Sequence, residues 1–250
     1  MVTRVKSPKE IAAMRESGRL LATVLTTLKE ALQPGISTKD LSEIAKRELR
    51  NTGGTPTFLG YYGFPDILCV SINNEVVHGI PSDKTIIKDG DLVSMDFGVT
   101  YDGMITDSAI TAIAGNVKDP KHARLVRDTQ AALNSGIAAA HNGCKVGDIA
   151  HAVESSLDKK YGIVRDLVGH GVGHELHEEP NIPNYGKAGT GMKLVTGMTI
   201  AIEPMVTLGS HKVYTDDDAW TVLTYDGSRA AHFEHTILIT ETGAEILTSI

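Results

Sequence analysis

Cysteine, aromatic residues and long apolar runs are all scarce in this 250-residue sequence. Its two cysteines, Cys69 and Cys144, are too few for the disulfide framework of a small secreted protein and favour reduced thiols. No apolar run approaches the roughly 18 residues that a membrane-spanning helix needs, and the opening MVTRVKSPKE lacks the apolar core of a signal peptide. We therefore expect a cytoplasmic protein that does not enter a membrane.

Basic charge is not in excess either, since the formal net charge is −7 and the lysines and arginines are scattered. Proteins that bind nucleic acid or anionic lipid usually gather basic residues on one face, so neither partner is indicated. Hydrophobic residues make up 41% of the chain, which is ordinary for a globular protein of one large domain or two small ones.

Helical and strand-like segments follow a regular order. Ser7-Pro8-Lys9-Glu10 reads as a capping box with proline at the first helical position, and helical spacing continues to Pro34-Gly35. Further helices are expected at about 38–51, from Pro120 to about 142, and from Asp148 to about 162. Strand-like runs follow each helix pair: 68–72, 92–97 and 104–113 after the first, and 163–168, 198–206, 219–225 and 230–240 after the second.

This order indicates an internal repeat. DLSEIAKREL at 40–49 aligns with DIAHAVESSL at 148–157, which lies 108 positions later. HGIP at 78–81 matches HEEP at 177–180, and GDLVSMD at 90–96 matches GMTIAIE at 197–203. Three matches in the same order favour a duplication. We predict one domain over residues 1–250, with halves of about 1–115 and 116–250 that face each other around a shared site.

Two aspartates stand near the end of the first half. If Asp102-Gly103 forms a two-residue hairpin turn, the numbers of facing residues sum to 205, so Asp96 faces Ala109 and Gly98 faces Asp107. Asp96 and Asp107 then lie diagonally on one face with Cβ atoms roughly 7 Å apart, close enough to raise each other's pKa. A cation between them would relieve the repulsion; two ordinary aspartates on a solvated hairpin are the alternative.

Glutamates also interrupt apolar strands of the second half. Glu203 in TIAIEPM and Glu234 in HFEHTILI are costly to bury unless they pair or bind metal, and no basic residue lies close in sequence. His170 and His174 are four residues apart, but three glycines oppose a helix and HELHE is not the helical zinc motif H-E-x-x-H. The four carboxylates with His170 instead suit two divalent ions of the Mn, Fe, Co or Zn kind.

These segments resemble those of type I methionine aminopeptidases in their short bacterial form. The resemblance covers nearly the whole chain and rests on VSINNEVVHGIP (70–81), MDFGVTYDGMITDSAIT (95–111), GHGVGHELHEEP (169–180), IAIEPM (200–205) and FEHTI (233–237). It implies an α/β (α+β) pita-bread fold, in which two pseudo-symmetric halves of helices pack on a curved antiparallel sheet. It also implies an aminopeptidase that removes the initiator methionine from nascent proteins and peptides when the second residue is small.

The resemblance implies a role for each site residue. The metal ligands would be Asp96, Asp107, His170, Glu203 and Glu234. Glu203 would also take a proton from the attacking water, His177 would stabilise the oxyanion, and His78 would contact the scissile amide. The methionine pocket would be formed by Tyr61, Tyr62, Phe64, Cys69, Leu176 and Trp220.

Some positions depart from the common bacterial pattern. Tyr62, Phe64 and Leu176 stand where histidine, tyrosine and phenylalanine are frequent, so pocket shape is the feature expected to differ. His174 falls at a variable position and is interpreted as a surface residue or one behind the metal ligands. The neighbouring Glu178 and Glu179 are interpreted as capping or ion-pairing groups.

Two other functions share much of this pattern. Xaa-Pro dipeptidases and aminopeptidases have the same catalytic fold, but they generally carry a large N-terminal domain, whereas here the catalytic module begins near residue 7. Non-catalytic relatives that bind peptides usually lose metal ligands, and all of the expected ligands are present here. The favoured function predicts a monomer that meets nascent N-termini at the ribosome.

Overall fold

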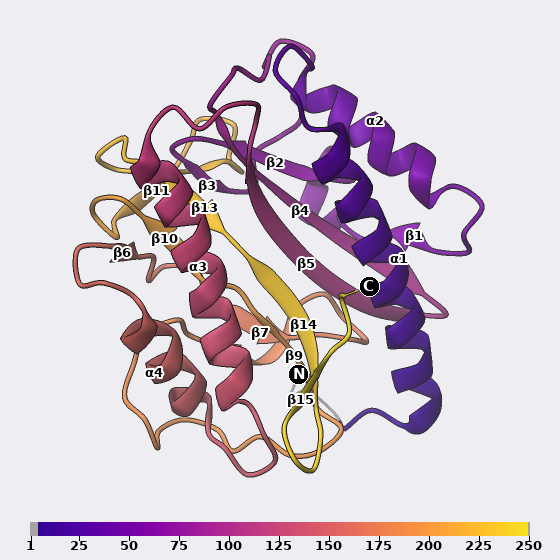
Figure 1. The fold of residues 1–250 in the computed structure, drawn as a ribbon. Coiled ribbons are helices and arrows are strands. Elements are labelled where there is room, and N and C mark those ends of the chain that lie inside the picture. Colours follow the sequence, from indigo (N-terminus) through magenta and orange to yellow (C-terminus); the bar gives the residue numbers. More distant parts are fainter. Residues whose placement is uncertain (1–4, 250) are drawn as a thin grey trace.

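A curved sheet of nine strands forms the centre of the protein, described here from a computed structural model over residues 5–249 (Figure 1). Along the sheet run β1 (Thr55–Pro56), β4 (Leu92–Tyr101), β5 (Met104–Ile113), β14 (Glu234–Ile239), β9 (Thr199–Ile202), β7 (Gly169–Gly171) and β8 (Glu178–Ile182). β2 (Cys69–Ile72) pairs with β4, and β15 (Ala244–Ile246) pairs with β14. These pairs are all antiparallel, as the family resemblance implies.

Two pairs of helices pack beside this sheet, one pair for each half of the chain (Figure 1). α1 (Pro8–Ala31) and α2 (Thr38–Leu49) contact the β4–β5 side, and α3 (Pro120–Ala139) and α4 (Val146–Ser156) contact the side of β14, β9 and β8. Two helices followed by strands thus occur twice along the chain, and the duplication itself stays a prediction. Residues 1–4 of the predicted first half and Ile250 of the second lie outside the described residues.

Each helix pair encloses its own hydrophobic core. Leu21, Leu41 and Phe97 are fully buried in the first core, and Leu133, Ile149 and Ile202 in the second. Burying one such side chain contributes about 1.5–3 kcal/mol, so each core holds its helices firmly against the strands. The strands β5 and β14, where the two halves meet, are thereby supported from both sides of the junction.

Helix starts follow the local sequence. The predicted capping box of α1 is confirmed: the Ser7 hydroxyl accepts from the N–H of Glu10, and the Glu10 carboxylate accepts from the N–H of Ser7. A second capping box at α2, between Ser37 and Asp40, was not predicted. α3 begins at Pro120 as predicted but ends at Ala139, before the expected stop.

Shorter strands complete the fold. β3 (Glu75–Val77), β11 (Val213–Thr215) and β12 (Val222–Thr224) form one small sheet, and β6 (Gly162–Ile163), β10 (Met205–Thr207) and β13 (Ala230–His232) form another. A short 3-10 turn, η1, covers Tyr61–Gly63. Within residues 5–249 the helices are too short or too polar to cross a membrane.

Two of the predicted strands are each interrupted in the structure, and the two interruptions are neighbours. The run 198–206 divides into β9 and β10 at Glu203-Pro204, and the run 230–240 divides into β13 and β14 at Phe233. Pro204 has no N–H to donate to a strand ladder, and its carbonyl accepts from the N–H of Phe233 at 3.4 Å, so the two breaks lie side by side. The predicted strand 163–168 is wrong beyond Ile163, because the chain there leaves the small sheet to reach β7.

Candidate metal centre and substrate pocket

The β4–β5 hairpin supplies two carboxylates. Its register is the predicted one, with Asp96 opposite Ala109 and Gly98 opposite Asp107. The turn is set by Asp102 and Gly103, whose φ angles of 46° and 76° are those of a two-residue hairpin turn that matches the twist of the strands. Both aspartates are buried, so the alternative of a solvated hairpin face is wrong.

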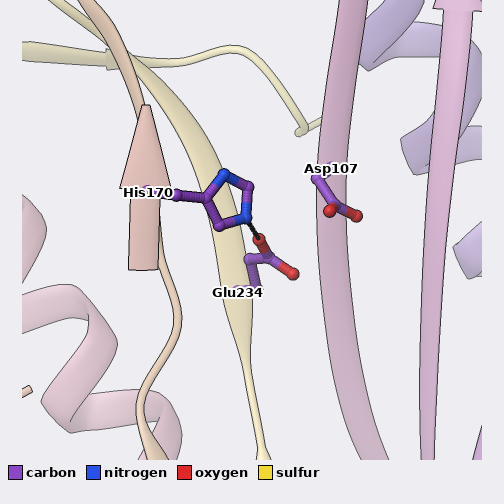
Figure 2. Close-up of side chains that lie close together, drawn as sticks. All are labelled: Asp107, His170 and Glu234. Atoms are coloured by element: carbon purple, nitrogen blue, oxygen red, sulfur yellow. Dashed lines mark ion pairs between the residues drawn. The ribbon is translucent and has the colours of Figure 1, made fainter. Parts of the chain in front are cut away.

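Three further groups come from the second half of the chain. His170 lies on β7, Glu203 directly follows β9, and Glu234 begins β14. Figure 2 shows the imidazole of His170, from β7, and the carboxylate of Glu234, from β14, pointing at each other, with Asp107 beside them on β5. One ligand atom from each of these three residues lies within 4.8 Å of the others. Both halves of the chain therefore contribute to one cluster.

His170 has a defined tautomer. Its Nδ1 lies 3.0 Å from the carbonyl oxygen of Gly171, and because a carbonyl oxygen only accepts, Nδ1 carries the proton. The lone pair is then on Nε2, which lies 3.5 Å from Glu203 Oε1 and 4.0 Å from Glu234 Oε1. Burial lowers the pKa of His170 to about 3, which favours this neutral form. Histidine binds metals in this state, with its other nitrogen held by a carbonyl.

The carboxylates of the cluster are strongly perturbed. Burial raises the pKa of Asp96 to about 6 and that of Glu203 to about 8. Burial, together with the neighbouring negative charges, raises the pKa values of Asp107 and Glu234 well above the usual range. Asp96 Oδ1, Asp107 Oδ1 and Glu234 Oε1 have no hydrogen-bond partner among residues 5–249. Divalent cations would satisfy these oxygens and remove the repulsion, so the donor set fits metal ions.

A cavity of about 280 Å³ opens onto the cluster. All thirteen residues proposed for the site from the sequence line it: Tyr61, Tyr62, Phe64, Cys69, His78, Asp96, Asp107, His170, Leu176, His177, Glu203, Trp220 and Glu234. The apolar wall is well packed, and the rings of Phe64 and Trp220 meet edge to face with centroids 5.1 Å apart. Tyr62 is 87% exposed and stands at the rim.

Two histidines face the cluster from different loops. His177 precedes β8, and its Nδ1 lies 2.8 Å from the Tyr61 hydroxyl while its ring meets that of His170 at 4.4 Å. His78 follows β3 with a φ of 62°, a left-handed conformation that residues other than glycine rarely adopt and that is frequent at functional sites. Burial lowers the pKa of His78 to about 4, so it is neutral at pH 7.

Sequence reasoning missed two residues of the site. Phe58 lines the cavity beside Phe64 and Cys69, and nothing in its local sequence distinguishes it from core. His232 is buried with Nε2 3.6 Å from Glu203 Oε2, and neither of its ring nitrogens has a hydrogen-bond partner within the described range. A signal for His232 did exist: it lies two residues before Glu234, and residues two apart share a face in a strand.

The sequence matches the family model of metallopeptidase family M24 over residues 12–241. The chain belongs to metallopeptidase family M24. It is 46% identical to methionine aminopeptidase 1 of Bacillus subtilis over 246 residues, which is 98% of each chain. The crystal structure of the methionine aminopeptidase of Thermotoga maritima superposes with a TM-score of 0.97, with 44% identity and all of both chains covered.

More distant solved structures share the fold alone. The prolidase from Pyrococcus furiosus is 22% identical with a TM-score of 0.78, and the match covers 99% of this chain but 66% of that one. The predicted pita-bread fold is confirmed by these superpositions. Membership of the metallopeptidase family also confirms the predicted class of cofactor, divalent metal ions.

Proposed function

We propose that this M24 enzyme removes the N-terminal methionine from proteins and peptides whose second residue is small. The full-length similarity to methionine aminopeptidases is the observation that carries the proposal, because it spans both halves of the shared site. The convergence of the proposed residues on one cavity supports it further. The likeness to prolidases lies under 25% identity and supports no substrate preference of its own.

Asp96, Asp107, His170, Glu203 and Glu234 would hold the metal ions. Divalent ions bound there supply a Lewis acid for the substrate and lower the pKa of a water molecule toward neutrality. Glu203 would accept the proton of the attacking water, since cations bound in the cluster would keep its carboxylate ionised; its oxygens lie 3.5 Å from His170 Nε2 and 3.6 Å from His232 Nε2. Attack on the first carbonyl carbon then breaks the bond to the nitrogen of the second residue.

The two loop histidines act on the substrate. When the Tyr61 hydroxyl donates to Nδ1 of His177, the ring proton of His177 is on Nε2 and can be donated to the oxyanion that forms on the carbonyl. His78, neutral at pH 7 because burial lowers its pKa to about 4, contacts the scissile amide and assists the departing nitrogen. The departing amine takes the proton that Glu203 accepted from water, and the carbonyl carbon, which now carries the water oxygen, ends as the carboxylate of free methionine.

The apolar wall accounts for the choice of methionine. Tyr61, Tyr62, Phe64, Cys69, Leu176 and Trp220 form this wall. A flexible thioether packs well against aromatic edges and another sulfur atom. Burial raises the pKa of Cys69 well above its usual value, so its thiol stays neutral beside the substrate sulfur. The proposed preference for a small second residue follows if the metal cluster and the loop histidines leave little room beyond the scissile bond.

We extend the proposal to where this activity acts. An enzyme with this specificity would meet nascent N-termini in the cytoplasm, at the ribosome, and would act as a monomer because each chain carries the whole cluster. Binding of purified enzyme to purified ribosomes in a sedimentation assay tests the first point, and light scattering tests the second. Failure to co-sediment with ribosomes would contradict the proposed action at the ribosome. A stable dimer would contradict the proposed monomer.

Peptide cleavage tests the main proposal. Met-Gly peptides should be cleaved with Mn, Fe, Co or Zn, cleavage should stop on addition of a chelator, and kcat/KM should be much lower for Met-Leu peptides. Similar kcat/KM values for the two peptides would contradict the predicted specificity. Turnover that requires proline in the second position would indicate a dipeptidase or aminopeptidase of the Xaa-Pro type, and binding without turnover would indicate a non-catalytic relative.

A further inference from the structure

The N-terminal segment packs against the loop that carries Leu176 and His177. Lys6 is buried, and its Nζ lies 2.9 Å from Oε2 of Glu178, the first residue of β8. The backbone of Lys6 is fixed as well, because its N–H donates to the carbonyl of Gly197 at 2.8 Å. Lys6 and Glu178 are 172 positions apart in sequence. A buried ion pair therefore joins the start of the described chain to the end of this loop.

The second oxygen of Glu178 holds the loop itself. Glu178 Oε1 accepts from the N–H of His174 at 2.7 Å and from the N–H of Glu175 at 3.2 Å. Burial alone would raise the pKa of Glu178, but the hydrogen bonds from Lys6 and these two amides outweigh it, and the pKa is lowered. One ionised carboxylate thus connects Lys6 to two successive amides just before His177.

Lys6 also fills the space beside Gly173. Gly173 has a φ of +147°, and a Cβ added there would stand 2.3 Å from Lys6 Cε. On the side of β5, the N–H of Ile105 donates to the carbonyl of Gly173 at 2.7 Å. A further contact joins α1 to the loop, since His174 Nε2 lies 2.7 Å from Glu10 Oε1. The loop is therefore held by both β5 and the N-terminal segment.

We propose that Lys6 and Glu178 are positioning residues, which hold residues 173–177 so that Leu176 and His177 stand in the substrate cavity. The inference rests on the function proposed above, because it gives the loop its catalytic use. The four carboxylates proposed to bind metal are placed differently, on or beside β4, β5, β9 and β14 of the central sheet. The fifth proposed ligand, His170, precedes the loop on β7, which is held by pairing with β9. The pair should consequently govern turnover without governing metal binding.

Lys6→Met tests the proposal, since methionine keeps the length of the side chain but leaves the Glu178 carboxylate buried without its cation. Amide hydrogen exchange should rise at least about tenfold in residues 172–178, because the two amides lose a fixed acceptor, and should be unchanged in the β4–β5 hairpin. For Met-Gly peptides, kcat should fall about 10- to 100-fold, as small misplacements of catalytic groups do, while KM changes less than about threefold. Affinity for Mn, measured by calorimetry, should stay within about twofold of wild type.

Lys9→Met is the matched control. Lys9 belongs to the same N-terminal stretch, but its side chain is 88% exposed and its Nζ lies 3.9 Å from Asp102. Exposed pairs of this kind contribute little, so exchange and kcat should equal those of wild type. A folded Lys6→Met protein with wild-type loop exchange and wild-type kcat would overturn the proposal. So would a loss of Mn affinity as large as the loss of kcat, because it would show a general loss of structure.

The double variant Lys6→Met/Glu178→Gln covers the case in which Lys6→Met does not fold. It removes the unpaired buried charge while the oxygen of the introduced amide can still accept from the loop N–H groups, so the protein should fold. Loop exchange should remain above wild type and kcat below it, because the introduced side chain is no longer tied to the N-terminal segment. Full recovery of both would overturn the proposal.

If wild type cleaves no Met-Gly peptide with any of the four metals, the proposed function fails. Loop exchange in the variants then still decides whether the Lys6–Glu178 pair holds the loop.

Discussion

The β4–β5 hairpin and the β7–β8 loop both bring side chains to the same cavity, but they do so by different means. In the hairpin, Asp96 and Asp107 are placed by ten consecutive residue pairs and a turn whose residues suit their backbone angles. In the loop, His177 is placed by side-chain contacts from distant segments, among them Tyr61 and the Lys6–Glu178 pair. Local ladder bonds thus fix these two proposed metal ligands, and long-range contacts fix the histidine proposed to contact the substrate.

This difference predicts how substitutions in each region should affect metal binding and activity. A change at the hairpin should remove metal and activity together, because the ligand atoms themselves are altered. A change at the loop should lower turnover while metal binding persists, because the four proposed carboxylate ligands lie outside the loop and His170 lies on β7, which is also paired with β9. Four substitutions test this separation.

Asp107→Asn should have the largest effect. The amide replaces a charged oxygen with a neutral one in a cluster of buried donors, so affinity for Mn should fall at least about 100-fold, beyond the 10- to 100-fold cost of disturbing residues behind the ligands. Cleavage of Met-Gly peptides should fall with it. Calorimetric titration with Mn and initial rates measure the two quantities.

Asp102→Asn is the matched control for this change. Asp102 lies in the turn of the same hairpin, its side chain is 61% exposed, and asparagine adopts its left-handed conformation readily. Wild-type Mn affinity is expected for this variant. Equal losses of Mn affinity in the two variants would mean that metal binding depends on the hairpin as a whole and not on the Asp107 carboxylate.

His177→Ala should have the second-largest effect, a loss of turnover without a loss of metal binding. The variant lacks the N–H that donates to the oxyanion, so kcat should fall about 10²- to 10³-fold. Its Mn affinity should match that of wild type, since His177 is outside the group formed by Asp107, His170 and Glu234. A large fall in Mn affinity would show that His177 supports the metal ligands. It would contradict the prediction that changes in the loop affect turnover and not metal binding.

The features that could be predicted from the sequence divide in the same way between the hairpin and the loop. The register of the hairpin was predictable because a two-residue turn at Asp102-Gly103 fixes every facing pair, and the structure has that register. Glu203 and Glu234 could be proposed as ligands from the sequence because a carboxylate in an apolar strand requires a partner, and both line the cavity. Lys6 was not predictable, since its partner Glu178 lies 172 positions away and no local pattern signals a buried lysine.

The breaks at Glu203-Pro204 and Phe233 were also missed. Both segments have the composition of continuous strands, and the interruption arises from the missing N–H of Pro204 and from pairing between the two breaks in the folded sheet. Periodicity describes a strand by itself and does not contain that tertiary pairing. The shape of the site at Glu203 therefore could not be read from sequence alone.

Gly173→Ala should produce a smaller loss, and Gly103→Ala provides the comparison. Both glycines have positive φ, of +147° and +76°, but an added Cβ meets Lys6 Cε at 2.3 Å at Gly173 and has no atom within 4 Å at Gly103. Gly103→Ala should cost about 1–2 kcal/mol of unfolding free energy from backbone strain alone, with kcat nearly unchanged. Gly173→Ala should cost more and lower kcat about tenfold, because Lys6 and the loop must move apart. Urea denaturation and Met-Gly cleavage measure both; equal effects on kcat would contradict a special role of the Lys6 contact.

The smallest expected effect is a pH dependence at the contact between α1 and the loop. Hydrogen bonds from the Ser7 N–H, the His174 side chain and the Ser7 hydroxyl lower the pKa of Glu10 from 4.5 to about 2. Because this pKa is lower in the folded than in the unfolded chain, the ionised group stabilises the fold above about pH 4.5, and the stabilisation is lost as pH falls from about 4.5 toward 2. Glu10→Gln should therefore lower the unfolding free energy modestly at pH 6, and the difference from wild type should shrink steadily below pH 4.5.

Denaturation with urea at several pH values between 3 and 6 measures this difference, with Glu43→Gln as the control. Glu43 is an exposed residue of α2 whose Oε1 lies 3.9 Å from Lys46 Nζ, so its loss should leave the unfolding free energy nearly unchanged. Since Glu10 contacts His174 in the loop, whereas the β4–β5 hairpin is held by its own ladder of residue pairs, loop exchange should rise slightly in Glu10→Gln while the hairpin stays protected. A difference from wild type that is independent of pH would show that Glu10 acts through packing, and the ionised contact would then contribute nothing to holding the loop.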